Sequence, residues 1–427
     1  MNKKNDNLPK HFKWNMTMGL FHGISFSFAM AFSEPFSVLP VFLETFGISR
    51  TMIGLLISII KTGSALPQLL VANKLRQLRS GKPILFAAIW GRWLAWGLIA
   101  GAVFLWGASA HTMVLISFVI LLFLFSFSGG VANVPFFNMV AKAIPADRRG
   151  RFFGLRQFWG GLAAVGAGLL VRWILAVPSI PFPQNYGYLF LITFILLTFG
   201  YIALTLFREP EHEAVTPAEE KHGRGLSVWA YLRQFASLRN VILSQMTSQS
   251  LLIAMPFFAI YAKEALHFPV SWVGYFVMAQ MLGGVVSNFL WAKLSDRFGN
   301  RIVIQLSILT ALAALILALL GRSFGLFVLV FVFAGFYFNG AGIGYNNYIM
   351  ELGDEKERPR LISIQGTLMF PVYFYPLLGG FLVDRFGFMA TFVIAALLLV
   401  LSFLLSFRLC EPRSGQAKCL IVPLRDV

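Results

Sequence analysis

The chain of 427 residues is too apolar for a water-soluble protein. Apolar residues make up 58% of it and charged residues only 12%, whereas a soluble domain is about 45–50% apolar and roughly a quarter charged. The net charge of +17 is compatible with nucleic-acid binding, a possibility that the distribution of the charge decides below. The apolar runs reach about 20 residues and do not alternate between apolar and polar residues, which disfavours a membrane barrel. The composition therefore predicts an all-α integral membrane protein.

Twelve apolar stretches are long enough to cross a bilayer, which requires about 20 residues per helix. We predict transmembrane helices at 16–43, 51–73, 83–106, 112–140, 152–177, 186–207, 240–263, 270–292, 302–320, 324–351, 361–384 and 387–407. These form an N-terminal six-helix half at 1–207 and a C-terminal six-helix half at 240–407. A polar linker at 208–239 separates the halves, and a tail follows at 408–427.

The distribution of Lys and Arg predicts the orientation in the membrane. With the N-terminus inside, most of the 35 Lys and Arg residues fall in cytoplasmic segments. The predicted outer segments hold only Arg50, Arg172, Lys263, Arg322 and Arg385. We therefore expect both termini, the linker and the tail in the cytoplasm, and we attribute the positive charge to topology rather than to a nucleic-acid partner.

The two halves resemble each other weakly. Residues 35–83 align with 256–303, so that Pro35 meets Pro256 and Gly54 meets Gly274. Such a parallel repeat relates two halves of a transporter by an axis along the membrane normal. We therefore predict pseudo-two-fold symmetry between the halves.

The most specific motif lies between the eighth and ninth predicted helices. It reads Ala292-Lys-Leu-Ser-Asp296-Arg297-Phe-Gly299-Asn300-Arg301 and resembles the loop signature of the major facilitator superfamily, a small residue followed by Asp-Arg-x-Gly and a basic cluster. The corresponding loop after the second helix is degenerate. The resemblance implies that Asp296, Arg297 and Arg301 form a cytoplasmic gate, a latch that holds the outward-facing state. Alternatively, the two arginines only fix the topology.

Three ionisable residues lie well inside predicted helices: Glu34, Lys61 and Arg92. Each costs about 2.5–3.5 kcal/mol in lipid on the insertion scale, so each is a functional candidate. Glu34, the only carboxylate there, is expected to share a helical face with Ser27 and Ser37. It is either a proton or substrate-charge site or the structural partner of Lys61. Arg92 is a structural ion-pair candidate, because the resemblance places its helix at the periphery.

The resemblance also implies that the first, fourth, seventh and tenth helices line a central cavity. An amide facing lipid would lack hydrogen-bond partners, so the amides on these helices face protein or water. We expect them to bind the substrate, with hydrogen bonding between helices as the alternative. They are Asn133, Asn138, Gln245, Gln249, Asn339 and Asn346. The lone His22 in the first helix is interpreted as structural.

The sequence contains no metal-binding, phosphate-loop or nucleophile motif, so we expect no metal, no cofactor, no catalytic residue and no enzymatic activity. We expect a monomeric secondary transporter of the inner (plasma) membrane that moves a small solute by alternating access. Proton coupling through Glu34 is a hypothesis. A uniporter and a non-transporting sensor or receptor on the same fold are the alternatives. Polar neutral solutes, amphipathic drugs and anions all remain open as substrates.

Overall fold

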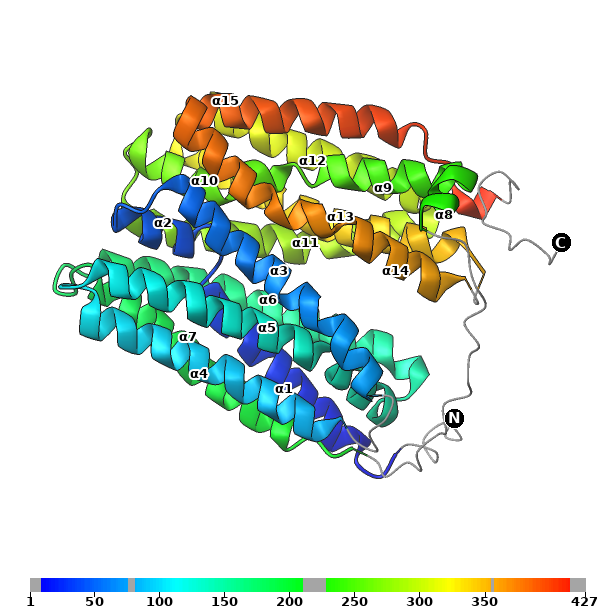
Figure 1. The fold of residues 1–427 in the computed structure, drawn as a ribbon, viewed down its shortest axis with the longest axis horizontal. Helices are drawn as coiled ribbons and strands as arrows, with labels where there is room; N and C mark the ends of the chain where they lie inside the picture. The colour runs from blue at the N-terminus through cyan, green and yellow to red at the C-terminus, as the bar shows by residue number, and fades with distance from the viewer. Residues whose placement is uncertain (1–8, 76–80, 210–227, 355–356, 415–427) are drawn as a thin grey trace. The chain divides into compact units, whose positions relative to one another are not determined.

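The computed structural model describes residues 9–75, 81–209, 228–354 and 357–414, and these residues form helices without β-strands (Figure 1). The prediction of an all-helical protein is therefore confirmed for this part of the chain. The chain divides into two compact units, and each is described here by itself.

Unit 1 comprises Met1–Gly47, Leu56–Glu220 and Val270–Met278. Its helices are α1 (Phe12–Ala31), α2 (Val38–Thr45), α3 (Arg50–Leu75, from Leu56 onward), α4 (Lys82–Trp106), α5 (His111–Ala143), α6 (Ala146–Ala176) and α7 (Gln184–Thr205). Helix α1 packs against α6 and α7, and α4 packs against α5 and α7. These five helices surround the site described below.

Unit 2 comprises Ile48–Leu55, Lys221–Pro269 and Ala279–Val427. Its helices are α8 (Val228–Gln234), α9 (Ala236–Ser248), α10 (Leu251–Glu264), α11 (Val273–Phe298, from Ala279 onward), α12 (Asn300–Leu320), α13 (Phe324–Leu352), α14 (Arg358–Leu368) and α15 (Tyr375–Ser406). Short 3-10 turns lie at Phe370–Phe374 and Pro412–Ser414, and a third, Val270–Trp272, belongs to unit 1. Helix α15 packs against α9, α10 and α12, and α12 also packs against α13.

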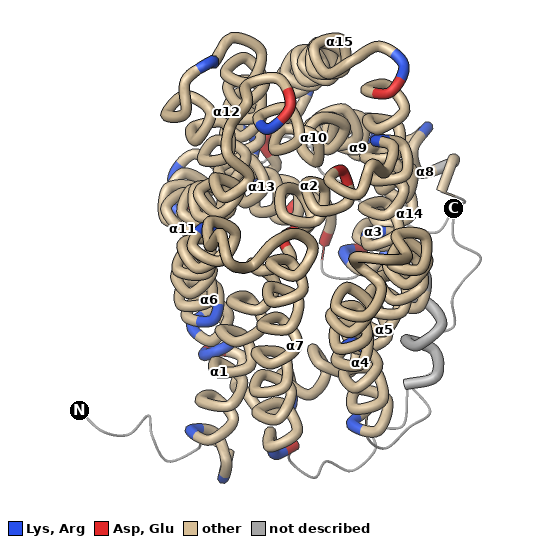
Figure 2. Tube along the Cα trace, turned by 90° about the vertical axis from the view of Figure 1, so that its left-hand side faces the viewer, with Lys and Arg blue, Asp and Glu red and all other residues tan. Residues whose placement is uncertain are grey.

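The helices expose apolar side chains to their surroundings. Leu105 and Leu320, for example, are 73% and 74% exposed, and long stretches of the helices carry no charged residue (Figure 2). Within the described residues, nine stretches are long and apolar enough to cross a membrane: Lys82–Trp106, His111–Ala143, Ala146–Ala176, Gln184–Thr205, Ala236–Glu264, Val270–Phe298, Asn300–Leu320, Phe324–Leu352 and Arg358–Ser406. They identify a multi-pass membrane protein and do not by themselves establish twelve spans.

Several predicted transmembrane helices are interrupted. The stretch 16–43 is two helices, α1 and α2. Pro35 lies in the break between them, and proline has no backbone N–H to donate to a helical hydrogen bond. The stretch 240–263 is α9 and α10, which meet at residues 249–250. Gly387, with φ of +80°, separates the last two predicted helices within α15. Hydropathy predicts that a segment is apolar and does not reveal such breaks.

Candidate functional site

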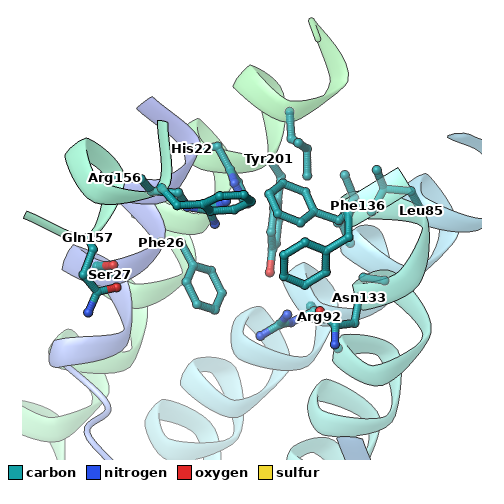
Figure 3. A pocket seen from close by; sticks show the side chains of 16 residues that line it. His22, Phe26, Ser27, Leu85, Arg92, Asn133, Phe136, Arg156, Gln157 and Tyr201 are labelled. Carbon is teal, nitrogen blue, oxygen red and sulfur yellow. The ribbon is translucent and has the colours of Figure 1, made fainter. Parts of the chain in front are cut away.

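A cavity of about 540 Å³ lies within unit 1 (Figure 3). Its volume is in the range of small-molecule sites, roughly 300–1,000 Å³. Helices α1, α4, α5, α6 and α7 each contribute to its wall. The described lining residues are His22, Phe26, Ser27, Leu85, Ile89, Arg92, Gly129, Ala132, Asn133, Phe136, Phe137, Phe153, Arg156, Gln157, Tyr201 and Leu204.

Basic and aromatic side chains dominate the cavity wall. The guanidinium of Arg92 lies 4.9 Å from the ring centre of Phe26 and 4.2 Å from that of Phe125. The guanidinium of Arg156 lies 4.8 Å from the ring centre of Phe136. Each such stacking contact contributes about 0.5–2 kcal/mol and leaves the edge of the guanidinium free to donate hydrogen bonds.

No Asp or Glu belongs to the described lining of this cavity. Within the described chain, Arg92 and Arg156 make neither an ion pair nor a hydrogen bond. Three atoms on the wall are buried without a hydrogen-bond partner: Nε of Arg92, Nδ1 of His22 and the hydroxyl oxygen of Tyr201. Because buried polar atoms in proteins are nearly always hydrogen-bonded, the cavity offers unsatisfied polar groups in an excess of positive charge.

Two glycines make room for the arginines. A methyl group at Gly23 would overlap the side chain of Arg156, which crosses α1 at this point. A methyl group at Gly129 would come within 3.2 Å of a terminal nitrogen of Arg92. The positions of both guanidinium groups therefore depend on glycine in the facing helix.

Of the residues predicted on the first and fourth helices, Asn133 lies on the cavity wall. Asn138, on the same helix α5, is exposed and lines a separate small pocket beside the Lys142–Glu209 ion pair, where the nitrogen and oxygen are 2.7 Å apart. The sequence analysis expected Arg92 to be peripheral and ion-paired. It lies on the cavity wall, and no described carboxylate pairs with it.

Glu34 lies outside this cavity, in the break between α1 and α2. Its side chain is almost completely buried and accepts hydrogen bonds from the Phe36 N–H (2.8 Å) and from the Ser37 hydroxyl (2.7 Å). Lys61 on α3 is attracted electrostatically to Glu34, and its Nζ lies 5.4 Å from the ring centre of Phe36. The predicted common helical face with Ser27 was wrong, because α1 ends at Ala31.

The other predicted amides belong to unit 2 and do not form one site. Gln245 accepts a hydrogen bond from Gln365 (2.9 Å). Asn339 donates to the carbonyl of Gly335 (3.3 Å) in its own helix. Gln249 is the residue at which α9 ends, and Asn346 is exposed. The hydrogen bond of Gln245 joins α9 to α14, whereas that of Asn339 stays within α13.

Unit 2 also contains a buried network of tyrosine and serine hydroxyl groups, which the sequence analysis did not predict. The Tyr337 hydroxyl donates to the carbonyl of Ser248 (2.7 Å), and the Tyr345 and Ser244 hydroxyls are 2.9 Å apart. Ser402 donates to the carbonyl of Ser244 (2.8 Å). These groups satisfy one another, unlike the polar groups of the unit 1 cavity.

The predicted gate residues lie in a charged cluster at one end of unit 2. The backbone N–H of Arg301 donates to Glu411 (3.1 Å), and Arg297 stacks 5.0 Å from the ring centre of Phe298. Arg413 donates twice to Glu351 (2.6 and 3.0 Å). These hydrogen bonds raise the pKa of the Arg413 guanidinium, and Asp296 adds to the attraction. The sequence did not predict the partners Glu351, Glu411 and Arg413.

A second cluster in unit 2, also missed from the sequence, surrounds the start of α3. Asp384 accepts hydrogen bonds from the backbone N–H groups of Arg50 (3.2 Å) and Thr51 (2.8 Å) and from the Thr51 hydroxyl (2.7 Å). The Arg50 side chain forms an ion pair with Glu264. Asp384 thus satisfies N–H groups that the first turn of a helix leaves unpaired.

The sequence also missed four residues of the cavity: His22, Arg156, Gln157 and Tyr201. Arg156 lies near the start of the predicted helix 152–177, but α6 begins at Ala146, so Arg156 lies about 15 Å along the helix. The sequence analysis interpreted His22 as a structural residue, whereas the structure places it on the cavity wall.

Comparisons with known proteins agree on one family. The sequence profile of the Major Facilitator Superfamily matches residues 21–258 and 240–418. The chain is 26% identical over 297 residues to the uncharacterized MFS-type transporter YfmI of Bacillus subtilis (strain 168), covering 65% of this chain and 71% of that one. It is 25% identical over 170 residues to the multidrug resistance protein MdtG of Dickeya zeae (strain Ech586), covering 38% and 40% of the two chains.

Solved transporter structures share the fold at low sequence identity. The D-xylose-proton symporter has a TM-score of 0.68 and 16% identity, over 95% of this chain and 98% of that one. The nucleoside transporter NupG has a TM-score of 0.65 and 16% identity, over 92% and 98%. The human organic anion transporter MFSD10 has a TM-score of 0.62 and 15% identity, over 93% and 100%.

Proposed function

Because the chain belongs to the Major Facilitator Superfamily and is a multi-pass membrane transporter, we propose that it is a secondary transporter that moves a small solute by alternating access. The observation that carries the proposal is the 540 Å³ cavity of unit 1, whose wall presents buried donors and acceptors without protein partners. A solute in the cavity can bind to the guanidinium groups of Arg92 and Arg156 and to the amide of Asn133, which line it.

The proposed organisation is twelve transmembrane helices in two pseudo-symmetric halves, 1–207 and 240–407. The protein is a monomer in the bacterial inner membrane, with the 208–239 linker, the 408–427 tail and both termini in the cytoplasm. The concentration of Lys and Arg in the predicted cytoplasmic segments supports this orientation. Most of the linker and of the tail lies outside the described residues.

Arg92 and Asn133 are the predicted residues that we propose for solute binding, with His22 and Arg156 added. Asp296, Arg297 and Arg301 form the proposed cytoplasmic gate. We assign Glu34 a structural role with Lys61, which its two local hydrogen bonds support. No carboxylate lines the described cavity wall, which favours facilitated transport over proton coupling at that site.

The test is exchange of radiolabelled solutes in proteoliposomes, with a sugar, an aromatic carboxylate and a lipophilic cation as probes. We expect at least one probe to exchange, and Asn133→Ala to slow its exchange by about ten-fold, the effect of losing roughly 1.4 kcal/mol of hydrogen bonding. Asn138→Ala is the matched control, since the residue lies on the same helix outside the cavity. Equal effects of the two variants would contradict the assignment of this cavity, and no exchange of any probe would favour the sensor alternative.

A further inference from the structure

We propose that the unit 1 cavity binds an organic anion, an oxyanion head group carried on an aromatic or aliphatic body. The inference rests on the proposed transport function and names the class of its solute. The head group is a carboxylate, phosphate or sulfonate held by Arg92 and Arg156.

The charge balance of the wall determines the sign of the solute. Two arginines face the cavity, and its described lining contains no acid. His22 lines the same cavity and lies within electrostatic range of both guanidinium groups. An oxyanion supplies the missing negative charge and accepts the N–H groups that the protein leaves unpaired, and arginine forms its strongest hydrogen bonds with such groups.

The arrangement of the rings determines the rest of the solute. Phe26 and Phe136 each stack on one of the arginines, and Tyr201 lies beside them on the wall (Figure 3). Stacking fixes the planes of the two guanidinium groups and leaves their edges for the head group. The apolar faces of Leu85, Phe136 and their neighbours then accommodate an apolar body.

The same wall disfavours the other solute classes. A cationic drug would meet two arginines with no carboxylate in the described lining to offset the repulsion. A neutral sugar would form hydrogen bonds but would leave both positive charges without a counter-charge in a partly dehydrated site, which is unfavourable.

The first experiment measures binding to the purified full chain in a neutral detergent. The probes are matched triplets: 4-phenylbutyrate, 1-naphthoate and indole-3-acetate, each with its primary amide and its amine. We expect at least one acid to stabilise the protein thermally and its amide and amine to bind about ten-fold more weakly or worse, as expected for a lost charge-assisted hydrogen bond. Equal binding of acid and amide, or the absence of stabilisation by any acid, would overturn the inference.

The second experiment compares Arg92→Gln and Arg156→Gln with Arg172→Gln. Arg172 is the matched control because it lies on the same helix as Arg156, also has a buried Nε without a partner and also stacks on a ring, 4.8 Å from the centre of Tyr275, but lies outside the cavity. We expect each of the first two changes to weaken binding of the acid about ten-fold and Arg172→Gln to leave it unchanged.

Gly23→Val provides a variant that keeps both charges. It is expected to displace the Arg156 side chain and to weaken acid binding without removing an arginine. Unfolding of each variant without ligand, followed by tryptophan fluorescence, separates loss of binding from loss of folding. Unchanged affinity in a folded Arg92→Gln or Arg156→Gln protein would overturn the inference.

A membrane lipid carries the same head-group chemistry, so the final comparison uses nanodiscs. Acid binding is measured in phosphatidylcholine alone and with added phosphatidylglycerol. We expect equal affinities, and displacement of the acid by phosphatidylglycerol would assign the cavity to lipid and overturn the inference. An acid that binds but does not exchange in proteoliposomes would contradict transport alone, whereas exchange of neutral probes without acid binding would contradict the anion site alone.

Discussion

At the scale of single residues, Glu34 shows how a carboxylate can remain inside a membrane protein. Its side chain accepts the Phe36 N–H and the Ser37 hydroxyl and lies near the cation of Lys61. These contacts give the buried carboxylate hydrogen-bond donors and a neighbouring cation, as a buried polar group requires. The break between α1 and α2 depends on the same contacts, since they pair polar groups that precede the start of α2.

We therefore expect Glu34→Gln to lower the free energy of unfolding by about 2 kcal/mol, because it leaves Lys61 without its counter-charge. The double change Glu34→Gln/Lys61→Met should recover much of that loss, together with solute exchange. Thermal unfolding in detergent and exchange in proteoliposomes measure the two effects. If Glu34→Gln were as stable as the wild type and lost only pH-driven accumulation, Glu34 would be a proton site.

Single residues of the cavity differ in how well the sequence reveals them. Arg92 stands out because it interrupts an apolar run, and Asn133 because the family resemblance places its helix at a cavity. His22 and Arg156 carry no such signal, since a lone histidine is usually structural and Arg156 follows a run of cytoplasmic arginines. Their role depends on distances between α1 and α6, which a sequence does not contain.

At the scale of elements, the start of α3 depends on a side chain more than 300 positions away. Asp384 accepts two backbone N–H groups and one hydroxyl there, and its negative charge is favourable at the positive end of a helix. It acts as a helix cap supplied from α15.

Asp384→Ala should therefore destabilise the first turn of α3 by about 1–2 kcal/mol, as the loss of an N-cap does. Amide hydrogen exchange at residues 51–55 should accelerate roughly 5- to 30-fold. Arg385→Ala, at the neighbouring position, is the control and should leave that exchange unchanged. If the amides of residues 51–55 were equally protected from exchange in both variants, Asp384 would contribute little to the stability of the first turn of α3.

The cytoplasmic cluster of unit 2 permits a test of the proposed gate. If Asp296 holds the outward-facing state, Asp296→Asn should shift the population towards the inward-facing state at near-normal expression. Distances between spin labels on the cytoplasmic ends of α5 and α13 should then lengthen. Asp147→Asn is the matched control, because Asp147 follows the fourth predicted helix in a related motif and is 77% exposed. If the distances and the transport rate were unchanged, Asp296 would not be part of a gate, and the charged residues of its loop would only fix the membrane topology.

Hydropathy predicts the positions of most elements and few of their breaks. Predicted stretches such as 302–320 and 324–351 agree closely with α12 and α13, because uninterrupted apolar runs are typical of straight helices. The runs 16–43 and 240–263 were predicted as single helices but are divided in two. At the break in 16–43, the buried carboxylate of Glu34 accepts hydrogen bonds from the Phe36 N–H and the Ser37 hydroxyl. At the break in 240–263, the Tyr337 hydroxyl donates to the carbonyl of Ser248.

At the scale of the whole molecule, the bias of Lys and Arg makes the topology testable. In a background with Cys410 and Cys419 replaced by Ser, a cysteine at the exposed position Ser179 should react with an impermeant maleimide added outside intact cells. A cysteine at Glu220, outside the described residues, should not react until the membrane is permeabilised. Labelling of position 220 in sealed cells would contradict the proposed orientation.

The family and the helical class followed from composition and from one loop motif, whereas the location of the cavity did not. The motif at Asp296 is local in the sequence and therefore readable. The cavity combines residues of five helices, of which only α1 and α5 were expected to line one. Of the expected ligands in unit 2, Gln245 makes a hydrogen bond that joins α9 to α14, and Asn339 makes one within α13.

The excess of positive charge in the cavity also has an electrical consequence. A bound monoanion cancels one of the two arginine charges, so the loaded and empty proteins differ in charge inside the membrane. Moving one elementary charge through the whole membrane potential changes the free energy by about 2.3 kcal/mol per 100 mV. Voltage therefore acts more strongly on the return of the empty protein than on the loaded step, and the membrane potential, together with the solute gradient, sets the direction of net flux.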